Sequence, residues 1–390
     1  MSVFCIISEF NPLHNGHKYL IDQARAMGAE AVVCVMSGNA TQRGELAVVD
    51  KYCRAEAAVR SGADLVLELP YPWCASSAEY FGTAGVCIAG SFGDKLIFGS
   101  ECGSIEKLQR AAELCETEDF SEEYRRLTAD GMGAARAFET CLADRGVTEL
   151  SSNDLLGIAY IRAIHRLDVA MTPVTVKREG GGYNQRETVE GALQSATAMR
   201  EYIKRGDIEG MAEYVPQPML RILKEEYAEG RIADIEQISS LVLGYYRLAD
   251  AEAEELDCIA DMTGGLSSRF ITAARQSTTV SQMLERLSTK RYTDAKLRRA
   301  LLFGLTGARR ELIASLPEYT VLLAANKKGR ELLAKNRKTE GIRVVTKPAD
   351  TPRESGQFRQ SSRLEDIYCM AKSSPSSAEE AFRRGAFVEK

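Results

Sequence analysis

The chain has 390 residues, of which 45% are hydrophobic and 27% charged, and its formal net charge is −5 at pH 7. This length predicts two or three domains with a substantial core, and no apolar run approaches the roughly 20 residues that span a bilayer, which argues against a membrane-spanning protein. The ten cysteines are scattered singly, without a C-x-x-C pair, and this pattern predicts reduced thiols, a cytoplasmic location and no structural zinc site.

The first half of the chain alternates short β-rich runs with segments of helical periodicity. Strands are predicted at residues 3–7, 31–36, 64–69, 95–98 and 174–176. Such alternation is typical of an α/β fold with a Rossmann-like, doubly wound parallel sheet. Within a first domain of residues 1–210, residues 104–148 are predicted as an acidic helical insertion. A helical domain at 211–316 and a small mixed α/β region at 317–390, with a strand at 342–345, are predicted to follow.

The charge is unevenly distributed along the chain. Residues 286–347 contain sixteen Lys and Arg against five Asp and Glu, a balance of +11, so the rest of the chain carries about −16. Charge runs are often solvated faces, but this segregation of sign favours a polyanion site. Nucleic acid is a better match than a membrane surface, because no basic amphipathic helix with exposed aromatic residues stands out.

The segment EFNPLHNGH, from Glu9 to His17, follows the first predicted strand and holds two of the three histidines. A helical pattern comes next, so both imidazoles are predicted to lie at a helix N-terminus on the carboxyl edge of the sheet. Such an edge binds nucleotides in open α/β folds, and a helix N-terminus favours phosphate. His14 and His17 are therefore predicted to donate N–H bonds to phosphate oxygens in a transition state. Gly16 is predicted to let the nucleotide approach the backbone.

Other segments are predicted to converge on the same edge. Gly99 ends the fourth predicted strand, and Arg178 precedes a glycine-rich loop. Asn153 lies in an N-cap cluster, where plain helix capping is an equally good interpretation. The later run SATAMR offers hydroxyl groups and an arginine to a triphosphate; its candidate contacts are Ser195, Thr197 and Arg200.

The H-x-G-H turn, combined with a Ser/Thr-rich run that ends in arginine, resembles the HIGH-type nucleotidyltransferase superfamily, which includes class I aminoacyl-tRNA synthetases. More specifically, a collinear set of segments resembles the tRNA(Met) cytidine acetate ligase family and covers most of residues 1–305, whereas the later residues match more loosely. These segments are EFNPLHNGHKYLI, VMSGNATQRGELAVVDKYCRAEAA, GADLVLELPYPWCASSAEYF, LIFGSE, SSNDLLGIAYI, KREGGGYN, SATAMR and TKRYTDAKLRRALL.

The resemblance implies ATP-dependent activation of acetate as acetyl-adenylate, and then transfer of the acetyl group to N4 of the wobble cytidine of elongator tRNA(Met). ATP would be a co-substrate accompanied by Mg²⁺, and AMP and pyrophosphate would be released. Residues 1–210 would be catalytic and 211–316 would bind tRNA; the oligomeric state stays open. His14 and His17 are implied to be catalytic. The residues implied to bind ATP are Ile7, Ser8, Glu9, Phe10, Asn11, Pro12, Leu13, His14, Asn15, Gly16, His17, Lys18, Tyr19, Leu20, Gly99, Asn153 and Arg178. Those implied to hold the tRNA are Lys290, Arg291, Lys296, Arg298 and Arg299.

Three other functions compete with this one. The main alternative is a small-molecule adenylyltransferase of the same superfamily, but such enzymes are typically small single domains and lack a basic helical half. A non-catalytic RNA-binding protein with a vestigial nucleotide fold would not need both histidines with Asn153, Arg178 and Arg200. An acetyl-CoA-dependent acetyltransferase would not need H-x-G-H.

Overall fold

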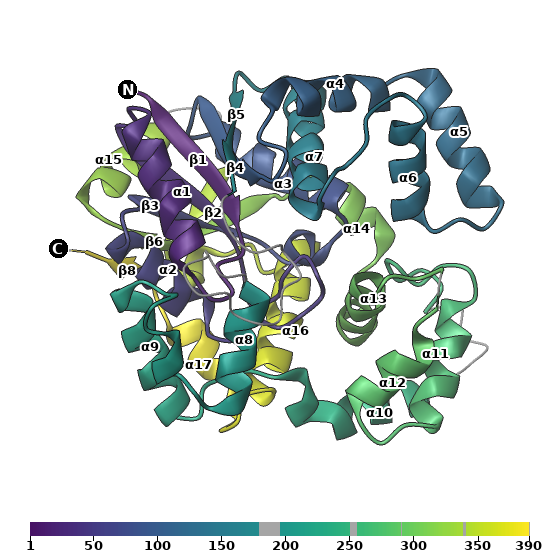
Figure 1. Ribbon diagram of the computed structural model, residues 1–390. Coiled ribbons are helices and arrows are strands. Elements are labelled where there is room, and N and C mark those ends of the chain that lie inside the picture. The colour runs from purple at the N-terminus through teal and green to yellow at the C-terminus, as the bar shows by residue number, and fades with distance from the viewer. Residues whose placement is uncertain (179–195, 250–255, 290, 338–340, 390) are drawn as a thin grey trace.

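The centre of the protein is an eight-stranded sheet with the strand order β5-β4-β1-β2-β3-β6-β7, in which β8 pairs with β6. The computed structural model in Figure 1 describes residues 1–178, 196–249, 256–289, 291–337 and 341–389. The strands are β1 Val3–Ser8, β2 Ala31–Ser37, β3 Leu65–Leu69, β4 Lys95–Ser100, β5 Thr172–Lys177, β6 Tyr319–Ala325, β7 Arg343–Val345 and β8 Phe387–Val388. Strands β1 to β5 run parallel, whereas β6 is antiparallel to β3. The predicted Rossmann-like parallel sheet is confirmed.

Helices follow most strands of the parallel part. The helices of the first half are α1 Asn15–Ala26, α2 Lys51–Arg60, α3 Ala78–Gly90, α4 Ile105–Cys115, α5 Glu118–Ala129, α6 Ala134–Ala143, α7 Ser152–Arg166 and α8 Ala196–Arg205. Those of the second half are α9 Gln217–Ala228, α10 Ser239–Leu248, α11 Leu266–Arg275, α12 Val280–Leu287, α13 Asp294–Thr306, α14 Arg310–Ala314, α15 Lys327–Asn336, α16 Gly356–Met370 and α17 Ala378–Arg383.

Two apolar cores lie on opposite faces of the sheet, because successive side chains of a strand point to opposite faces. On β1, Cys5 and Ile7 pack in the core that includes α3 and α7, whereas Phe4 and Ile6 pack in the core of α1 and α2. Strands covered on both faces read as continuous apolar runs, as this one does. Helices on both faces make the sheet doubly wound, as predicted (Figure 1).

Two helical groups extend from the sheet, as Figure 1 shows at its upper and lower right. Helices α4, α5 and α6 lie between β4 and β5, where the acidic insertion at 104–148 is predicted. Helices α10 to α13 fall within the predicted helical domain. Among the described residues, no helix combines the length and apolarity that crossing a membrane requires.

The C-terminal region extends the central sheet. The strand predicted at 342–345 is confirmed as β7, but β6 and β8 were not predicted. Strand β6 is almost wholly buried between helices and so lacks an alternating polar face that would mark it as a strand. Its pairing with β3 joins residues 319–325 to the first domain. The division at 210 and 316 stays a prediction. Strands β6, β7 and β8 of the C-terminal region belong to the central sheet.

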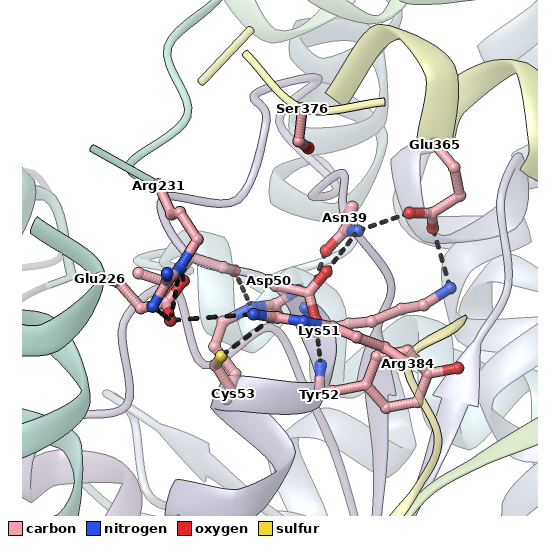
Figure 2. Close-up of polar contacts among 12 residues, drawn as sticks. Asn39, Asp50, Lys51, Tyr52, Cys53, Glu226, Arg231, Glu365, Ser376 and Arg384 are labelled. Carbon is pink, nitrogen blue, oxygen red and sulfur yellow. Dashed lines mark hydrogen bonds and ion pairs between the residues drawn. The ribbon is translucent and has the colours of Figure 1, made fainter. Parts of the chain in front are cut away.

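A buried ionic network fixes the C-terminal helix α16 to the start of α2 (Figure 2). Lys51 Nζ lies 2.9 Å from Glu68 Oε1 and 2.8 Å from Glu365 Oε1. Asn39 connects α16 to the start of α2. Its Nδ2 donates to Glu365 and its Oδ1 accepts the Lys51 N–H, each at 2.8 Å. Burial alone would lower the pKa of Lys51, but the attraction of Glu365 and Glu68 outweighs it and raises that pKa well above its usual value. The lysine is therefore charged.

Candidate active site

The turn between β1 and α1 brings two histidines to the first turn of a helix. His14 is the N-cap of α1, and Phe10 in the turn has a φ of +46°, a left-handed conformation that is rare for a bulky residue. Phe10 is fully buried, and its ring meets the edge of the His17 ring with centroids 5.0 Å apart. Strain of this kind persists only where the surroundings hold the residue, and it is concentrated at functional sites.

The two imidazoles are arranged as hydrogen-bond donors. His14 Nδ1 accepts the Gly16 N–H at 3.1 Å, and His17 Nδ1 accepts the His14 N–H at 3.3 Å. The rings stack with centroids 3.8 Å apart. A neutral imidazole that accepts at Nδ1 carries its proton on Nε2, so these bonds assign that tautomer to both rings. Each histidine then has one Nε2–H to donate to a ligand.

Burial and nearby cations keep both rings neutral. Burial, followed by the positive charges of Arg178 and Arg200, lowers the pKa of His14 to about 3. Burial, then His14 and Arg178, lowers the pKa of His17 well below its usual value. Because both pKa values lie below neutrality, both rings are neutral near pH 7 and can act on a ligand as N–H donors.

A pH titration tests this assignment. We expect the His14 and His17 imidazoles to keep the neutral Nε2–H form from pH 8 to about 5 in ¹⁵N NMR spectra, with His165→Ala to assign the third histidine. Below the unfolded value of about 6.5 the unfolded chain binds protons that the folded chain does not. Stability should therefore fall as the pH drops from 6.5 toward 3, by about 1.4 kcal/mol per pH unit for His14, and His17 should add a loss of the same sign. Imidazole signals that protonate above pH 6 would contradict the assignment.

A cavity of about 130 Å³ opens beside the histidines and collects most of the predicted ATP residues. Those that line it are Ile7, Ser8, Glu9, Asn11, His14, His17, Leu20, Gly99, Asn153 and Arg178. Glu101 joins two of them, because it accepts from Asn153 Nδ2 at 2.7 Å and pairs with Arg178 Nε at 3.4 Å. Strands β1 and β4 and helix α7 thus contribute to one site.

Two buried polar atoms of this cavity have no partner among the described residues. Ser8 Oγ and Asn11 Nδ2 lack hydrogen bonds, and the residues are only 9% and 1% exposed. The other side of the Asn11 amide is fixed, since its Oδ1 accepts the Val48 N–H at 2.8 Å. Leaving buried donors unsatisfied costs free energy, so these atoms fit a ligand that supplies oxygens, such as the ribose and phosphates of a nucleotide.

The other predicted ATP residues support the turn from outside the cavity. Phe10 and Leu13 are buried in the core, Lys18 pairs with Asp22 on the surface, and Asn15 Nδ2 donates to the Glu213 carbonyl. Pro12, Gly16 and Tyr19 likewise do not line the cavity. A β-carbon at residue 16 would lie 2.9 Å from His14 Cε1, so the glycine makes room for that imidazole and not only for a nucleotide.

The predicted triphosphate run lies partly behind the turn. Ser195 falls outside the described residues. Arg200 donates to the Asn11 carbonyl at 3.1 Å and to Thr197 Oγ1 at 3.2 Å, and it pairs with Glu45 at 3.1 Å. Neither Thr197 nor Arg200 lines the cavity, whereas Ala196 does. In this arrangement Arg200 positions the turn and lowers the pKa of His14 through its charge.

Several residues of the site were not among the predicted ATP-binding residues. Gln42 lines the cavity and donates its N–H to Glu9 Oε1 at 2.8 Å, and the fully buried Arg54 donates to the Glu9 carbonyl at 2.6 Å. Leu156 and Tyr160 line the cavity from α7. Their spacing from Asn153, i+3 and i+7, places all three on one helix face, and this signal was available in the sequence. The role of Arg54 depends on its burial and could not be seen there.

The predicted tRNA-binding residues differ in their placement. Lys290 falls outside the described residues. Arg299 is only 8% exposed and pairs with Asp261 at 2.7 Å, so its predicted tRNA contact stays a prediction that this burial does not support. Arg291 is exposed, and together with Lys296 it lies over the Tyr292 ring, at 5.6 and 5.3 Å from the centroid.

A larger cavity of about 770 Å³ lies next to these basic residues. Arg298 and Leu297 of α13 line it, opposite Ile203 and Lys204 of α8. Residues 44–46 and 48 also contribute, whereas Gln42 of the same segment lines the smaller cavity. The segment from Gln42 to Val48 therefore contributes lining residues to both cavities.

The chain is similar to proteins of one family along almost its whole length. A sequence model described as HIGH Nucleotidyl Transferase matches residues 1–382. The tRNA(Met) cytidine acetate ligase of Caldanaerobacter subterraneus subsp. tengcongensis is 32% identical over 388 residues, which cover 95% of this chain and 96% of that protein. The protein of the same name from Acetivibrio thermocellus is 33% identical over 372 residues, covering 90% and 89%.

Solved structures show the same similarity in three dimensions. The apo form of Thermotoga maritima TmcAL is 29% identical, has a TM-score of 0.91, and is matched over 100% of this chain and 99% of that chain. Thermotoga maritima TmcAL bound with alpha-thio ATP is 28% identical, with a TM-score of 0.89 and the same coverage.

Proposed function

The chain belongs to the HIGH nucleotidyltransferase family and, within it, to the tRNA(Met) cytidine acetate ligases, and from this membership we propose how its residues perform that reaction. The enzyme activates acetate with ATP as acetyl-adenylate and acetylates N4 of the wobble cytidine of elongator tRNA(Met). The observation that carries the assignment of the site is the stacked pair His14 and His17, whose Nε2–H groups remain for a ligand beside the orphaned Ser8 Oγ and Asn11 Nδ2.

Adenylation at this site needs positioning and electrostatics and no protein nucleophile. An acetate oxygen attacks the α-phosphorus of ATP, and pyrophosphate leaves as the bond to the β-phosphate oxygen breaks. Negative charge grows on the phosphate oxygens in the transition state, where the His14 and His17 Nε2–H groups donate to them. Preorganised donors of this kind are each worth about 3–4 kcal/mol. The residues with unpartnered polar atoms, together with Asn153 and Arg178, hold the nucleotide.

Mg²⁺ accompanies ATP in this proposal and is held mainly by the phosphates. Among the described residues no group of three His, Cys, Asp or Glu side chains could hold a metal ion. The protein residues therefore do not fit a resident metal site, and we derive no step from one. Because all ten cysteines are free thiols in the structure, a reducing cytoplasm is also proposed as the location.

The tRNA is proposed to bind at the larger cavity and along the basic start of α13. The double variant Arg291→Ala/Arg298→Ala should weaken tRNA binding about tenfold and reduce the slope of log K against log salt by about 1–2. Acetate-dependent ATP–pyrophosphate exchange should stay unchanged, because neither residue lines the nucleotide cavity. Filter binding at several salt concentrations measures the effect, with the exposed Arg383→Ala as a matched control. Equal losses in both variants would place the tRNA elsewhere.

A labelling experiment tests the function and its alternative. The protein is incubated with ATP, Mg²⁺ and radiolabelled acetate, with and without bacterial tRNA, and the tRNA nucleosides are analysed. Label in N4-acetylcytidine with release of AMP is the expected result. ATP turnover without label in tRNA would instead favour a small-molecule adenylyltransferase, and no turnover would favour an RNA-binding protein with a vestigial nucleotide site.

A further inference from the structure

The second half of the reaction releases a proton that some group must accept. When the cytidine N4 amine attacks the carbonyl carbon of acetyl-adenylate, the new C–N bond leaves a positive charge on nitrogen. The C–O bond to AMP then breaks, and AMP leaves with that electron pair. The amine proton must pass to a base within hydrogen-bond reach of N4.

The two histidines are not available as that base. The Nδ1 lone pair of each ring already accepts a backbone N–H, and Nε2 carries the ring proton. Burial also lowers both pKa values far below neutrality. Arg178 has no lone pair to offer. Among the described residues that line the smaller cavity, Glu9 is the one carboxylate.

The geometry of Glu9 suits a proton acceptor. Its Oε1 accepts the Gln42 N–H at 2.8 Å, whereas no described residue forms a hydrogen bond with Oε2. Its carbonyl accepts from the buried Arg54, and the left-handed Phe10 follows it, so the main chain on both sides is fixed. Burial raises the pKa of the Glu9 carboxyl, against the opposing effects of the Gln42 N–H and Arg200. A raised pKa brings a carboxylate closer to the range that general bases use.

The position of Glu9 also fits the arrival of a second substrate. Its partner Gln42 belongs to the segment whose residues 44–46 and 48 line the larger cavity, while Gln42 and Glu9 line the smaller one. A carboxylate among phosphate-binding groups repels ATP and acetate, so it needs a cationic or proton-donating partner. The cytidine amine is such a partner, because its N–H groups can donate to the carboxylate.

We propose that Glu9 is the catalytic base of acetyl transfer, its free Oε2 accepting the N4 proton as AMP leaves. This inference rests on the proposed function. After the step, Glu9 is neutral, and the products are N4-acetylcytidine and AMP. Adenylation involves no such proton, because acetate attacks ATP as an anion. Glu9 is therefore required for the second half-reaction and dispensable in the first.

The test separates the two half-reactions in Glu9→Gln, which keeps the shape and the Gln42 contact but cannot accept the proton. We expect acetate-dependent ATP–pyrophosphate exchange within about threefold of wild type, and single-turnover transfer of labelled acetyl to saturating tRNA slowed by about 10²-fold or more. Retained exchange also shows that the variant folds. Glu379→Gln is the control, since the Glu379 side chain is 70% exposed and lines neither cavity, and it should transfer acetyl normally.

Two outcomes would overturn the role of Glu9 and leave the proposed function standing. If exchange falls as far as transfer, Glu9 acts on ATP or its Mg²⁺; if transfer is unchanged, another group accepts the proton. A wild-type protein that exchanges pyrophosphate but never labels tRNA overturns the proposed function itself, and Glu9 with it. The wild-type reaction therefore distinguishes the two failures.

Discussion

His17→Ala should lower the rate of acetyl-adenylate formation by about 10²–10³-fold while the protein stays folded. The substitution removes an Nε2–H aimed at the nucleotide cavity, and loss of one preorganised donor to a developing oxyanion has this effect in other enzymes. It also removes the acceptor of the His14 N–H, a helix-capping contact worth only about 1 kcal/mol. Acetate-dependent ATP–pyrophosphate exchange measures the rate, and circular dichroism measures the folded fraction.

Two further variants show whether the donor or the ring is responsible. His17→Gln places an amide N–H near the position of Nε2 and should recover part of the rate. His165→Ala removes the exposed third histidine, which lies at the end of α7, and should exchange at the wild-type rate. If His17→Ala turns over normally, the histidine pair has no part in the chemistry.

The two histidines could be placed at a helix N-terminus from the sequence because the pattern around them is local. An H-x-G-H run between an apolar strand and a helical pattern requires both imidazoles to lie at a helix N-terminus, whatever the rest of the chain does. The capping box of α1 is formed from these two histidines, so the same residues that start the helix also serve the site. Gly99, Asn153 and Arg178 could be added because the carboxyl ends of parallel strands meet at one edge.

Residues whose roles depend on distant packing could not be predicted in this way. Arg299 reads as one more cation in a basic run, and only its burial against Asp261 shows that it is internal. Arg54 looks like an ordinary helix residue, yet it is fully buried and donates to carbonyls of both Glu9 and Ser37, at the ends of β1 and β2. Both effects come from long-range contacts that no local pattern records.

The structure of the C-terminal region also depends on long-range contacts that could not be predicted from the sequence. An apolar run such as that of β6 does not distinguish a buried strand from a buried helix. The residues near it in the sequence also do not predict that it pairs with β3. What fixes the region is a set of polar residues far apart in the chain. Glu365 of α16 pairs with Lys51 at the start of α2, and Arg384 pairs with Asp50 at 3.3 Å (Figure 2). The C-terminal residues thus hold the segment that also carries Gln42.

Removing the cation of this network should have the largest effect on stability. Lys51→Met leaves Glu68 and Glu365 buried, at 4% and 7% exposure, without their shared partner. Breaking a buried ion pair from one side costs about 3–5 kcal/mol, because an uncompensated charge stays in the interior. Since domains of this kind are stable by only about 5–15 kcal/mol, the variant should lose a large part of its free energy of unfolding. Equilibrium unfolding in urea, followed by circular dichroism, measures the change.

Two other variants show whether the loss of the buried cation causes the loss of stability in Lys51→Met. Lys204→Met removes a lysine that is 62% exposed and paired with Glu201 on the same helix, so it should change stability by no more than about 0.5 kcal/mol. The triple variant Lys51→Met/Glu68→Gln/Glu365→Gln removes the stranded charges and should recover part of the loss, since neutral amides are cheaper to bury than carboxylates. A Lys51→Met protein within about 1 kcal/mol of wild type would show that water reaches the network, because solvated carboxylates need no buried cation.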